Sequence, residues 1–450
     1  DLEQAKTNYP EASSRDLKGK LLLPGFIDPH SHFGMMISAI GQANVAPPPA
    51  GTVTNFSDII VALENYRDAF GIKLSEWIFA WGYDETQLAE GKHITKIELD
   101  KAFPNNPVYL QHVSGHMGVA NSMALAQGGI DENTRDPIGG RIICFDDGKT
   151  PTGLVQEISM YYFAGKAIEE FQGKKAELFP KAQEHYLSFG VTTAQDGMTD
   201  PISMAFFRSL AAEEKLDFDL VTLHGYASLK NDDLEFKTYK NGLKVQGIKL
   251  IGDGSLQGKT AYFTQPYLTP VLGCEKDCVG FPHGPQDELN RLIGLAYEKG
   301  IQIFVHENGD AAIDMVIRAH EEESKRLGQP LDADRRTVVV HSQFVREDQL
   351  IKYRDYGMLP SFFTNHAFFW GDVHRENLGD ERAFFLSPIH TAHEKGIQFT
   401  NHSDEIVTPI NPMPGLHSAV NRVARSGAVI GEDERVSPYV ALKGVTEHAA

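Results

Sequence analysis

The sequence predicts an α/β fold, a closed (β/α)8 TIM-type barrel with a large insertion after its first strand. Two observations support this prediction: eight short apolar runs end in polar residues, and segments with helical periodicity lie between them. Alternating strands and helices form a parallel sheet, and eight such units are the number that closes a barrel. An open doubly wound sheet is the alternative, but no Gly-x-Gly-x-x-Gly motif follows the early strands.

The predicted strands share an apolar stretch that ends in polar or charged residues. They cover residues 21–28, 190–196, 220–224, 247–251, 301–306, 337–341, 358–362 and 397–402. Residues 286–299 and 311–326 carry apolar side chains at helical spacing, with charged side chains on the opposite face. Gly300, Gly357 and Gly396 stand just before predicted strands, where a glycine commonly ends the preceding helix.

The gap between the first and second predicted strands is too long for a single helix. We therefore expect an inserted subdomain at about residues 50–185, with strand-like runs of its own at 77–82 and 108–112. An insertion after a barrel strand lies on the C-terminal face, where barrel enzymes place their active sites. The insertion is predicted to be a substrate-binding cap; a purely stabilising appendage is the alternative.

The composition excludes several classes of protein. A chain of 450 residues with 41% hydrophobic residues buries a large core, which excludes intrinsic disorder. A formal charge of −19 disfavours binding to nucleic acid, and no apolar run is long enough for a membrane-spanning helix. The expected partner is a small-molecule substrate, and a homodimer is an open alternative. The polar start of the chain does not resemble a signal peptide. Two compartments are left as alternatives: the cytoplasm or, if a signal peptide was removed, the periplasm.

The strongest signal for a functional site is the pair His30 and His32 at the end of the first strand. Alternate residues of a strand point to the same side, so both imidazoles project into the mouth of the barrel. His306 and His341 end the fifth and sixth predicted strands and Asp404 follows the eighth, and all strand ends meet at one rim. Imidazoles and a carboxylate are typical ligands of zinc, so the sequence predicts a metal centre at this rim.

Lys249 lies inside the predicted fourth strand, where an unpaired ammonium group is costly. Carbamylation by carbon dioxide would convert it into an anionic ligand that bridges two metal ions. The alternative is an ion pair with Asp253, Asp196 or Glu157.

Several motifs resemble those of the metal-dependent amidohydrolase superfamily. They are most similar to its family 3, the YtcJ-like branch that includes N-substituted formamide deformylases. The motifs are PGFIDPHSH at 24–32, KLIGDGS at 249–255, HENGDAAID at 306–314, VHSQ at 340–343, NHSD at 401–404 with Pro409 and, in the insertion, WGYD at 81–84 and HVSGH at 112–116 with Asn121 and Ser122. They occur in the expected order over nearly the whole chain.

The resemblance implies a barrel that holds one or two zinc ions. His30 and His32 would hold the more buried ion together with Asp404. His306 and His341 would hold the second ion, and a carboxylated Lys249 would bridge the two. The superfamily also carries a small flanking β-sandwich, of which residues 1–20 would be a remnant, while residues 21–450 would form the barrel with its insertion.

The function implied is hydrolysis of a C–N bond in a small molecule, either an amide, a formamide or a cyclic imide. Zinc-bound water has a pKa near 7, which supplies a metal-activated hydroxide at neutral pH. Asp404 would take the proton of the water and pass it to the leaving nitrogen. Two alternatives stay open: hydrolysis of another bond, such as a lactone or phosphoester, and a metal-containing binding or regulatory protein without turnover.

Six further residues are candidate substrate contacts. They are Tyr83, His112, His116, His366, Trp370 and His402. Loop or core packing is the alternative for those in the insertion and after the seventh strand, and support of the metal ligands is the alternative for His402. Asp310 is expected to cap the helix after the fifth strand, with orientation of His306 as the alternative, and His374 is expected to be an ordinary surface or helix residue. Cys274 and Cys278 would form a small disulfide in an exported protein and stay reduced in the cytosol, while Cys144 has no evident partner.

Overall fold

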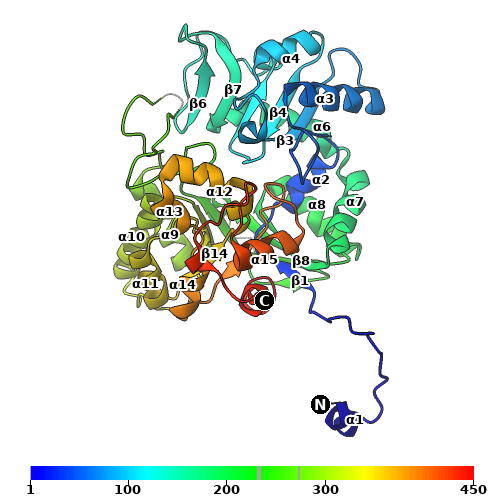
Figure 1. The fold of residues 1–450 in the computed structure, drawn as a ribbon, viewed down its shortest axis with the longest axis vertical. Coiled ribbons are helices and arrows are strands. Elements are labelled where there is room, and N and C mark those ends of the chain that lie inside the picture. The colour runs from blue at the N-terminus through cyan, green and yellow to red at the C-terminus, as the bar shows by residue number, and fades with distance from the viewer. Residues whose placement is uncertain (1, 231–234, 272–273) are drawn as a thin grey trace.

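A parallel β-barrel forms the main body of the computed structural model, which describes residues 2–230, 235–271 and 274–450 (Figure 1). Its strands, in spatial order, are β1 (Phe26–Asp28), β8 (Val191–Thr199), β9 (Asp219–Gly225), β11 (Leu243–Ile251), β12 (Gln302–Glu307), β13 (Val338–His341), β14 (Leu359–Phe362) and β15 (Thr400–Asn401). The first and last strands in this order, β1 and β15, are joined by two backbone hydrogen bonds just beyond their ends. Asp404 N–H donates to the His30 carbonyl at 3.1 Å, and His32 N–H donates to the Glu405 carbonyl at 2.6 Å. The predicted TIM-type barrel is confirmed.

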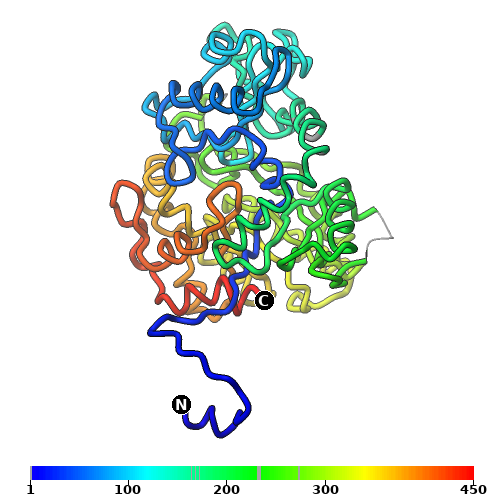
Figure 2. The backbone as a smooth tube through the Cα atoms, turned by 90° about the vertical axis from the view of Figure 1, so that its right-hand side faces the viewer, coloured from blue at the N-terminus to red at the C-terminus, as the bar shows by residue number. Residues whose placement is uncertain are grey.

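The first strand is shorter than predicted. Pairing with β8 begins only at Phe26, which lies opposite Val191 and whose N–H donates to Gly190. Leu21 and Leu22 have no such neighbour and are 81% and 76% exposed. Residues 21–25 therefore belong to an extended N-terminal segment, which leads away from the barrel to α1 (Leu2–Asn8) (Figures 1 and 2).

Amphipathic helices connect the barrel strands and bury their apolar faces against them. In α10 (Asp310–Arg326), for example, Ile313 and Ile317 are buried, while Lys325 and Arg326 complement the helix dipole at its C-terminus. The other helices around the barrel are α2 (Phe33–Ala39), α6 (Tyr161–Gln172), α7 (Lys175–Ser188), α8 (Pro201–Ala212), α9 (Gln286–Glu298), α11 (Glu347–Tyr356), α12 (Asn365–Leu378), α13 (Asp380–Phe384), α14 (Ile389–Glu394), α15 (Pro412–Asn421) and α16 (Pro438–Lys443). Short 3-10 turns cover Glu85–Gln87, Ile158–Met160, Tyr226–Lys230 and Glu432–Glu434, and β10 (Tyr239–Lys240) pairs with β11. No helix in the described part of the chain is long and apolar enough to cross a membrane.

A second sheet is built from the chain between β1 and β8. Its strands, in spatial order, are β2 (Ala43–Asn44), β3 (Ile78–Tyr83), β4 (Val108–His112), β5 (Met117–Ala120), β7 (Pro151–Glu157) and β6 (Gly140–Cys144). The strand-like runs at 77–82 and 108–112 correspond to β3 and β4. Helices α3 (Phe56–Phe70), α4 (Lys96–Ala102) and α5 (Ser122–Gln127) accompany the sheet, and together they form what we call the cap.

The cap sits over the end of the barrel opposite the N-terminal segment (Figures 1 and 2). Trp370 of α12 donates from Nε1 to Oδ2 of Asp84 in the cap at 2.8 Å. The ring of His116, just before β5, lies 5.2 Å from the ring of His306 in β12. The cap therefore covers the carboxyl ends of the barrel strands.

The sequence leaves open whether Cys274 and Cys278 are bonded to each other. Cys274 and Cys278 form a disulfide in the connection between β11 and α9, and Cys144 is free and half-buried.

Candidate metal centre

Three of the predicted ligands, His30, His32 and Asp404, converge at the rim of the barrel. One ligand atom from each lies within 4.8 Å of the others. Oδ1 of Asp404 is 3.5 Å from Nε2 of His30 and 3.3 Å from Nε2 of His32. His30 and Asp404 are buried, while His32 is partly exposed. The group has the composition and spacing that one metal ion needs.

The carboxylate of Asp28, at the end of β1, ties together the two loops that carry these ligands. It accepts hydrogen bonds from the backbone N–H groups of Ser403 and His30 and from the Ser403 hydroxyl. Burial raises the pKa of Asp28 to about 7, against the opposing effect of the Ser403 hydrogen bonds. Asp404 itself has a φ of 54°, a conformation that costs energy in a residue other than glycine and that the surrounding contacts must hold.

Gln195 of β8 fixes the orientation of the His30 ring. The Gln195 side-chain oxygen lies 2.9 Å from Nδ1 of His30, and because an amide oxygen only accepts, Nδ1 carries the proton. Nε2 therefore keeps its lone pair, which faces Asp404 and the Nζ of Lys249, 2.9 Å away. Outer partners of this kind fix the tautomer of metal-binding histidines. Gln195 stands in the predicted second strand, but a glutamine there gives no signal of this role.

Replacing Gly197 with Ala should displace the His30 ring and weaken metal binding by about 10–100-fold, the usual cost of disturbing a ligand's support. A Cβ at position 197 would lie 2.3 Å from Cε1 and 2.8 Å from Nδ1 of His30. The measurement is the zinc dissociation constant. The matched control is Gly225→Ala, because a Cβ there lies 3.8 Å from its nearest neighbour, the Met198 methyl group. Equal zinc affinity in the two variants would show that the His30 ring does not bind the ion.

The other two predicted histidines form a second pair beside the first group. Nε2 of His341 is 2.9 Å from Nδ1 of His306, and their rings lie 4.4 Å apart. The ring of His341 is also 5.6 Å from the ring of His30. The structure thus brings all six predicted metal-site residues, including Lys249, into one cluster at the strand ends.

The protonation states of the cluster suit a cation. Burial lowers the pKa values of His30, His306 and His341 well below the usual range, so these imidazoles are neutral. Burial alone would raise the pKa of Asp404, but the close approach of His32, whose Nε2 lies 3.3 Å from Oδ1, holds it below its ordinary value. Neutral imidazoles and an ionised carboxylate are the forms that bind metals.

Lys249 is buried among these groups, and burial lowers its pKa to about 7. Among the described residues no carboxylate oxygen lies within 4.0 Å of its Nζ, which contacts Nε2 of His30. The alternative prediction of an ion pair with Asp253, Asp196 or Glu157 is therefore wrong: these carboxylates are held by other groups.

His402 lies at the same centre. Its two ring nitrogens have no hydrogen-bond partner among the described residues, although the side chain is only 3% exposed. The ring lies 5.2 Å from His30, 5.0 Å from His341 and 4.6 Å from Phe363. A buried imidazole without a partner is costly, so this side chain has a hydrogen bond to offer to a bound molecule.

An aromatic wall runs from His402 towards the cap. The Phe363 ring is 4.6 Å from the ring of His366, which is 4.5 Å from that of Trp370. His374 was expected to be an ordinary residue, but it is buried and its Nε2 lies 3.0 Å from Nδ1 of His366. The surface alternative is therefore wrong, although His374 is a helix residue as expected: one face of α12 points inwards and buries both imidazoles.

The two predicted cap histidines, His116 and His112, lie at different sites. His116 lies at the centre, with its ring 5.2 Å from His306 and its Nδ1 2.9 Å from Oε2 of Glu157. His112 and Tyr83 do not reach the centre. Nε2 of His112 lies 2.7 Å from Oε2 of Glu85, and the Ser114 N–H donates to its Nδ1, so Nε2 is the protonated nitrogen that donates to Glu85. The Tyr83 hydroxyl lies 3.2 Å from Nδ1 of His93.

The predicted helix cap at Asp310 is wrong. Asp310 is the first residue of α10, and its carboxylate accepts from Thr264 and Arg346 instead. Asp253, in the loop after β11, accepts from the N–H groups of Asn308 and Gly309 and so holds the start of the helix. A carboxylate remote in sequence replaces the local cap, which a local pattern cannot reveal.

Residues 14–450 match the model of a family described as the amidohydrolase family. N-substituted formamide deformylase of Arthrobacter pascens is 27% identical over 454 residues, which cover 98% of this chain and 81% of the relative. The YtcJ protein of Bacillus subtilis (strain 168), named as an amidohydrolase, is 28% identical over 476 residues, covering 100% and 83%. The crystal structure of an uncharacterized metal-dependent hydrolase from Pyrococcus horikoshii OT3 shares the fold with a TM-score of 0.73 and 23% identity, covering 100% of this chain and 85% of that one.

Proposed function

Because the chain belongs to the amidohydrolase family, we propose that it is a zinc-dependent hydrolase that cleaves a C–N bond in a small molecule. The bond is that of an amide, a formamide or a cyclic imide. The observation that carries the proposal is the convergence of His30, His32 and Asp404 on one point beside the His306 and His341 pair.

The residues at the rim fit zinc. His30, His32 and Asp404 would hold one ion, and His306 and His341 would hold a second. Oδ1 of Asp404 has no hydrogen-bond partner among the described residues and is buried, as expected of an atom that awaits a cation. When bound, zinc lowers the pKa of water and polarises a carbonyl group.

Lys249 is proposed to be the carboxylated ligand that bridges the two ions. Its pKa of about 7 leaves much of the amine neutral at neutral pH, and the neutral amine is the form that attacks carbon dioxide. The new carboxylate would stand beside His30 and between the two groups of ligands.

Asp404 is proposed to move the proton of the reaction. It is ionised, buried and fixed beside both first-strand histidines, so it can accept a proton from the attacking water and hand it to the leaving nitrogen. His402 offers a free ring nitrogen to the substrate, and the wall of Phe363, His366 and Trp370 packs against its apolar part.

A chelator-sensitive activity screen tests this function. The purified protein, with its metal content measured, is assayed on formamides, N-acyl amino acids, cyclic imides and lactones. We expect hydrolysis of at least one C–N substrate, its loss after dialysis against a chelator, and recovery on adding Zn²⁺. Hydrolysis of lactones alone would favour the alternative bond, and no turnover by the fully loaded protein would favour a binding protein.

A further inference from the structure

The rim of the barrel is covered on one side and open to solvent on the other. The three residues that follow each of β11, β12, β13, β14 and β15 are all buried. After β8 the corresponding residues, Asp200, Pro201 and Ile202, are all exposed, and so are Tyr226 and Ala227 after β9. Because β8 and β9 are neighbours in the barrel, solvent reaches the rim beside these two strands.

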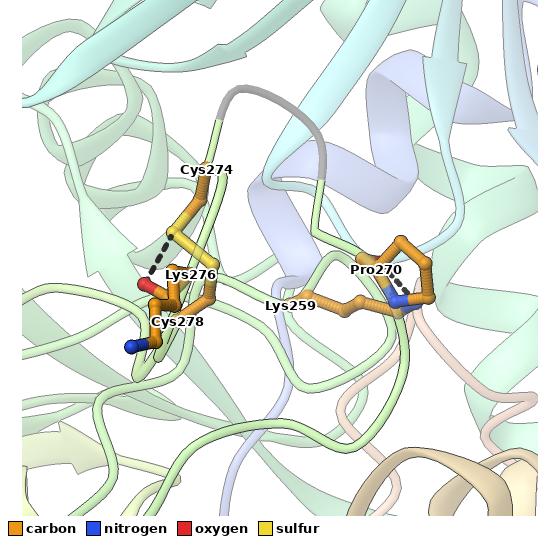
Figure 3. Close-up of a disulfide and its surroundings, with 5 residues drawn as sticks. All are labelled: Lys259, Pro270, Cys274, Lys276 and Cys278. Atoms are coloured by element: carbon orange, nitrogen blue, oxygen red, sulfur yellow. Dashed lines mark hydrogen bonds between the residues drawn. A yellow bond between two sulfur atoms is a disulfide. The ribbon is translucent and has the colours of Figure 1, made fainter.

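The connection from β11 to α9 helps to close the covered side. Near its start the Gly254 carbonyl accepts a hydrogen bond from Nδ2 of Asn308 at 2.9 Å, which ties the connection to the loop after β12. Further along, the Cys274–Cys278 disulfide joins two parts of the same connection (Figure 3). The open side therefore lies at β8 and β9, away from this connection.

The open side reaches the metal centre at Met198 of β8. Gly225 of β9 pairs in register with Lys249 of β11, and residues in register point to the same side of a sheet, so both face the barrel interior. A Cβ at Gly225 would lie 3.8 Å from the methyl group of Met198. Because Met198 is 36% exposed, its side chain borders both the solvent and the space beside Lys249. His32, a proposed zinc ligand, pairs with Asp196 of the same strand and is also partly exposed.

Two tyrosines extend this border. Tyr226, which begins the loop after β9, is 47% exposed, and Tyr161, at the start of α6, is 61% exposed. Partial burial and the nearby Tyr226 and Glu157 raise the pKa of Tyr161, so these groups lie within electrostatic reach of one another. Glu157 in turn holds His116 at the centre. The side chains of Met198, Tyr161 and Tyr226 thus form an apolar border beside the centre, which we call the apolar mouth.

The apolar mouth stands opposite the aromatic wall. β9 and β14 are four places apart in the ring of eight barrel strands, so the loops that follow them face each other across the rim. Phe363, His366 and Trp370 of the wall are buried, whereas the side chains of the mouth are exposed. A group bound against the wall is enclosed, but a group bound at the mouth can extend into solvent. Exposed apolar side chains that gather beside a ligand site mark a surface for apolar groups.

We propose that the apolar mouth binds an aryl or alkyl group of the substrate and that Met198, Tyr161 and Tyr226 select for this group. The inference rests on the proposed function, which places the scissile bond at the metal centre. The substrate class is then an amide that carries a large, uncharged apolar group on one side of the bond. A contact between two copies of the chain is the competing use of these side chains.

Hydroxamic acids that differ only in their apolar group test the inference. A hydroxamate chelates zinc, so it anchors each compound at the metal centre. One pair is acetohydroxamic and phenylacetohydroxamic acid, and the other is N-methyl- and N-benzyl-N-hydroxyformamide, so that the group grows from either side of the anchor. Calorimetry on the zinc-loaded protein measures binding. In at least one pair the aryl compound should bind about tenfold more tightly, as expected when part of a phenyl ring leaves water.

Three variants locate the binding of the phenyl ring. Met198→Ala combined with Tyr226→Ala should reduce the gain to about twofold or less and leave the affinity for the small compound within about twofold of the wild type. Tyr226→Phe should retain the gain, because it keeps the ring. Tyr439→Ala removes an exposed tyrosine from α16 and is the matched control, which should bind both compounds as the wild type does.

Equal affinity for the two members of both pairs in the wild type would overturn the inference. A full gain in the double variant would do the same, since the ring would then bind elsewhere. Loss of affinity for both members together would indicate a structural role. A change in oligomeric state of the double variant, measured by sedimentation, would assign the side chains to a subunit contact. Either of these two results would also contradict the inference.

Turnover separates the inference from the proposed function. Hydrolysis of amides without an apolar preference would leave the proposed function standing alone. An apolar preference that depends on Met198 and Tyr226, without turnover of any amide, would leave only the apolar mouth. If none of the hydroxamates bound to the zinc-loaded protein, both proposals would fail, because both need zinc at the centre.

Discussion

Replacing Asp404 with Asn is expected to lower kcat by about 10²–10⁴-fold while most of the metal stays bound. An amide has the shape of the carboxylate and an oxygen that can still face a cation, but it cannot accept the proton of the attacking water. The structure places this carboxylate within 3.5 Å of both first-strand histidines and gives its Oδ1 no other partner among the described residues. Steady-state kinetics and elemental analysis of the same zinc-loaded sample measure the two effects separately.

Asp334→Asn is the control for the removal of one negative charge. Its carboxylate lies at the surface, 3.5 Å from Arg336, and the change should leave kcat and metal content as in the wild type. Normal turnover by Asp404→Asn would remove its proposed role in proton transfer.

Replacing Lys249 with Ala is expected to reduce the metal content from two ions to one. Turnover should fall by more than about 100-fold, since even partners outside the ligand shell change metal affinity or activity by about 10–100-fold. The shortened side chain leaves a buried space beside His30. Acetate or propionate should enter that space, replace the lost carboxylate and restore part of the activity.

Lys352→Ala is a suitable control, because this lysine pairs with Glu321 in a partly exposed position. It should keep both ions and full turnover. Two ions bound to Lys249→Ala would mean that Lys249 does not bridge them, and a lack of rescue by both acids would argue against a carboxylated side chain.

The barrel and the members of its metal centre could be predicted because both follow from local patterns combined with one geometric rule. Apolar runs mark the strands, and all strand ends of a parallel barrel meet at one rim. Polar residues at the ends of the runs, such as His306 and His341, were therefore expected to come together. Their distance in sequence is irrelevant once the sheet closes.

The contacts that hold the centre could not be predicted, because they join residues that no local pattern relates. Gln195 orients His30, and Asp253 replaces the expected cap at Asp310. Leu21 and Leu22 look like strand residues but lack a neighbouring strand to pair with. In each case the tertiary partner, not the propensity of the residue, decides the outcome.

The carboxylate of Asp28 and the backbone of Ser403 are hydrogen-bonded across 375 positions of the chain. During translation the His30 and His32 pair is made before the other barrel strands, whereas Asp404, the proposed third ligand, follows the last of them. A nascent chain that stalls before that point carries two histidines and no complete chelating group. A metal ion proposed for this group can therefore be held by all three side chains only after the last barrel strand has been made, and a chain that is cut short before Asp404 cannot hold it in this way.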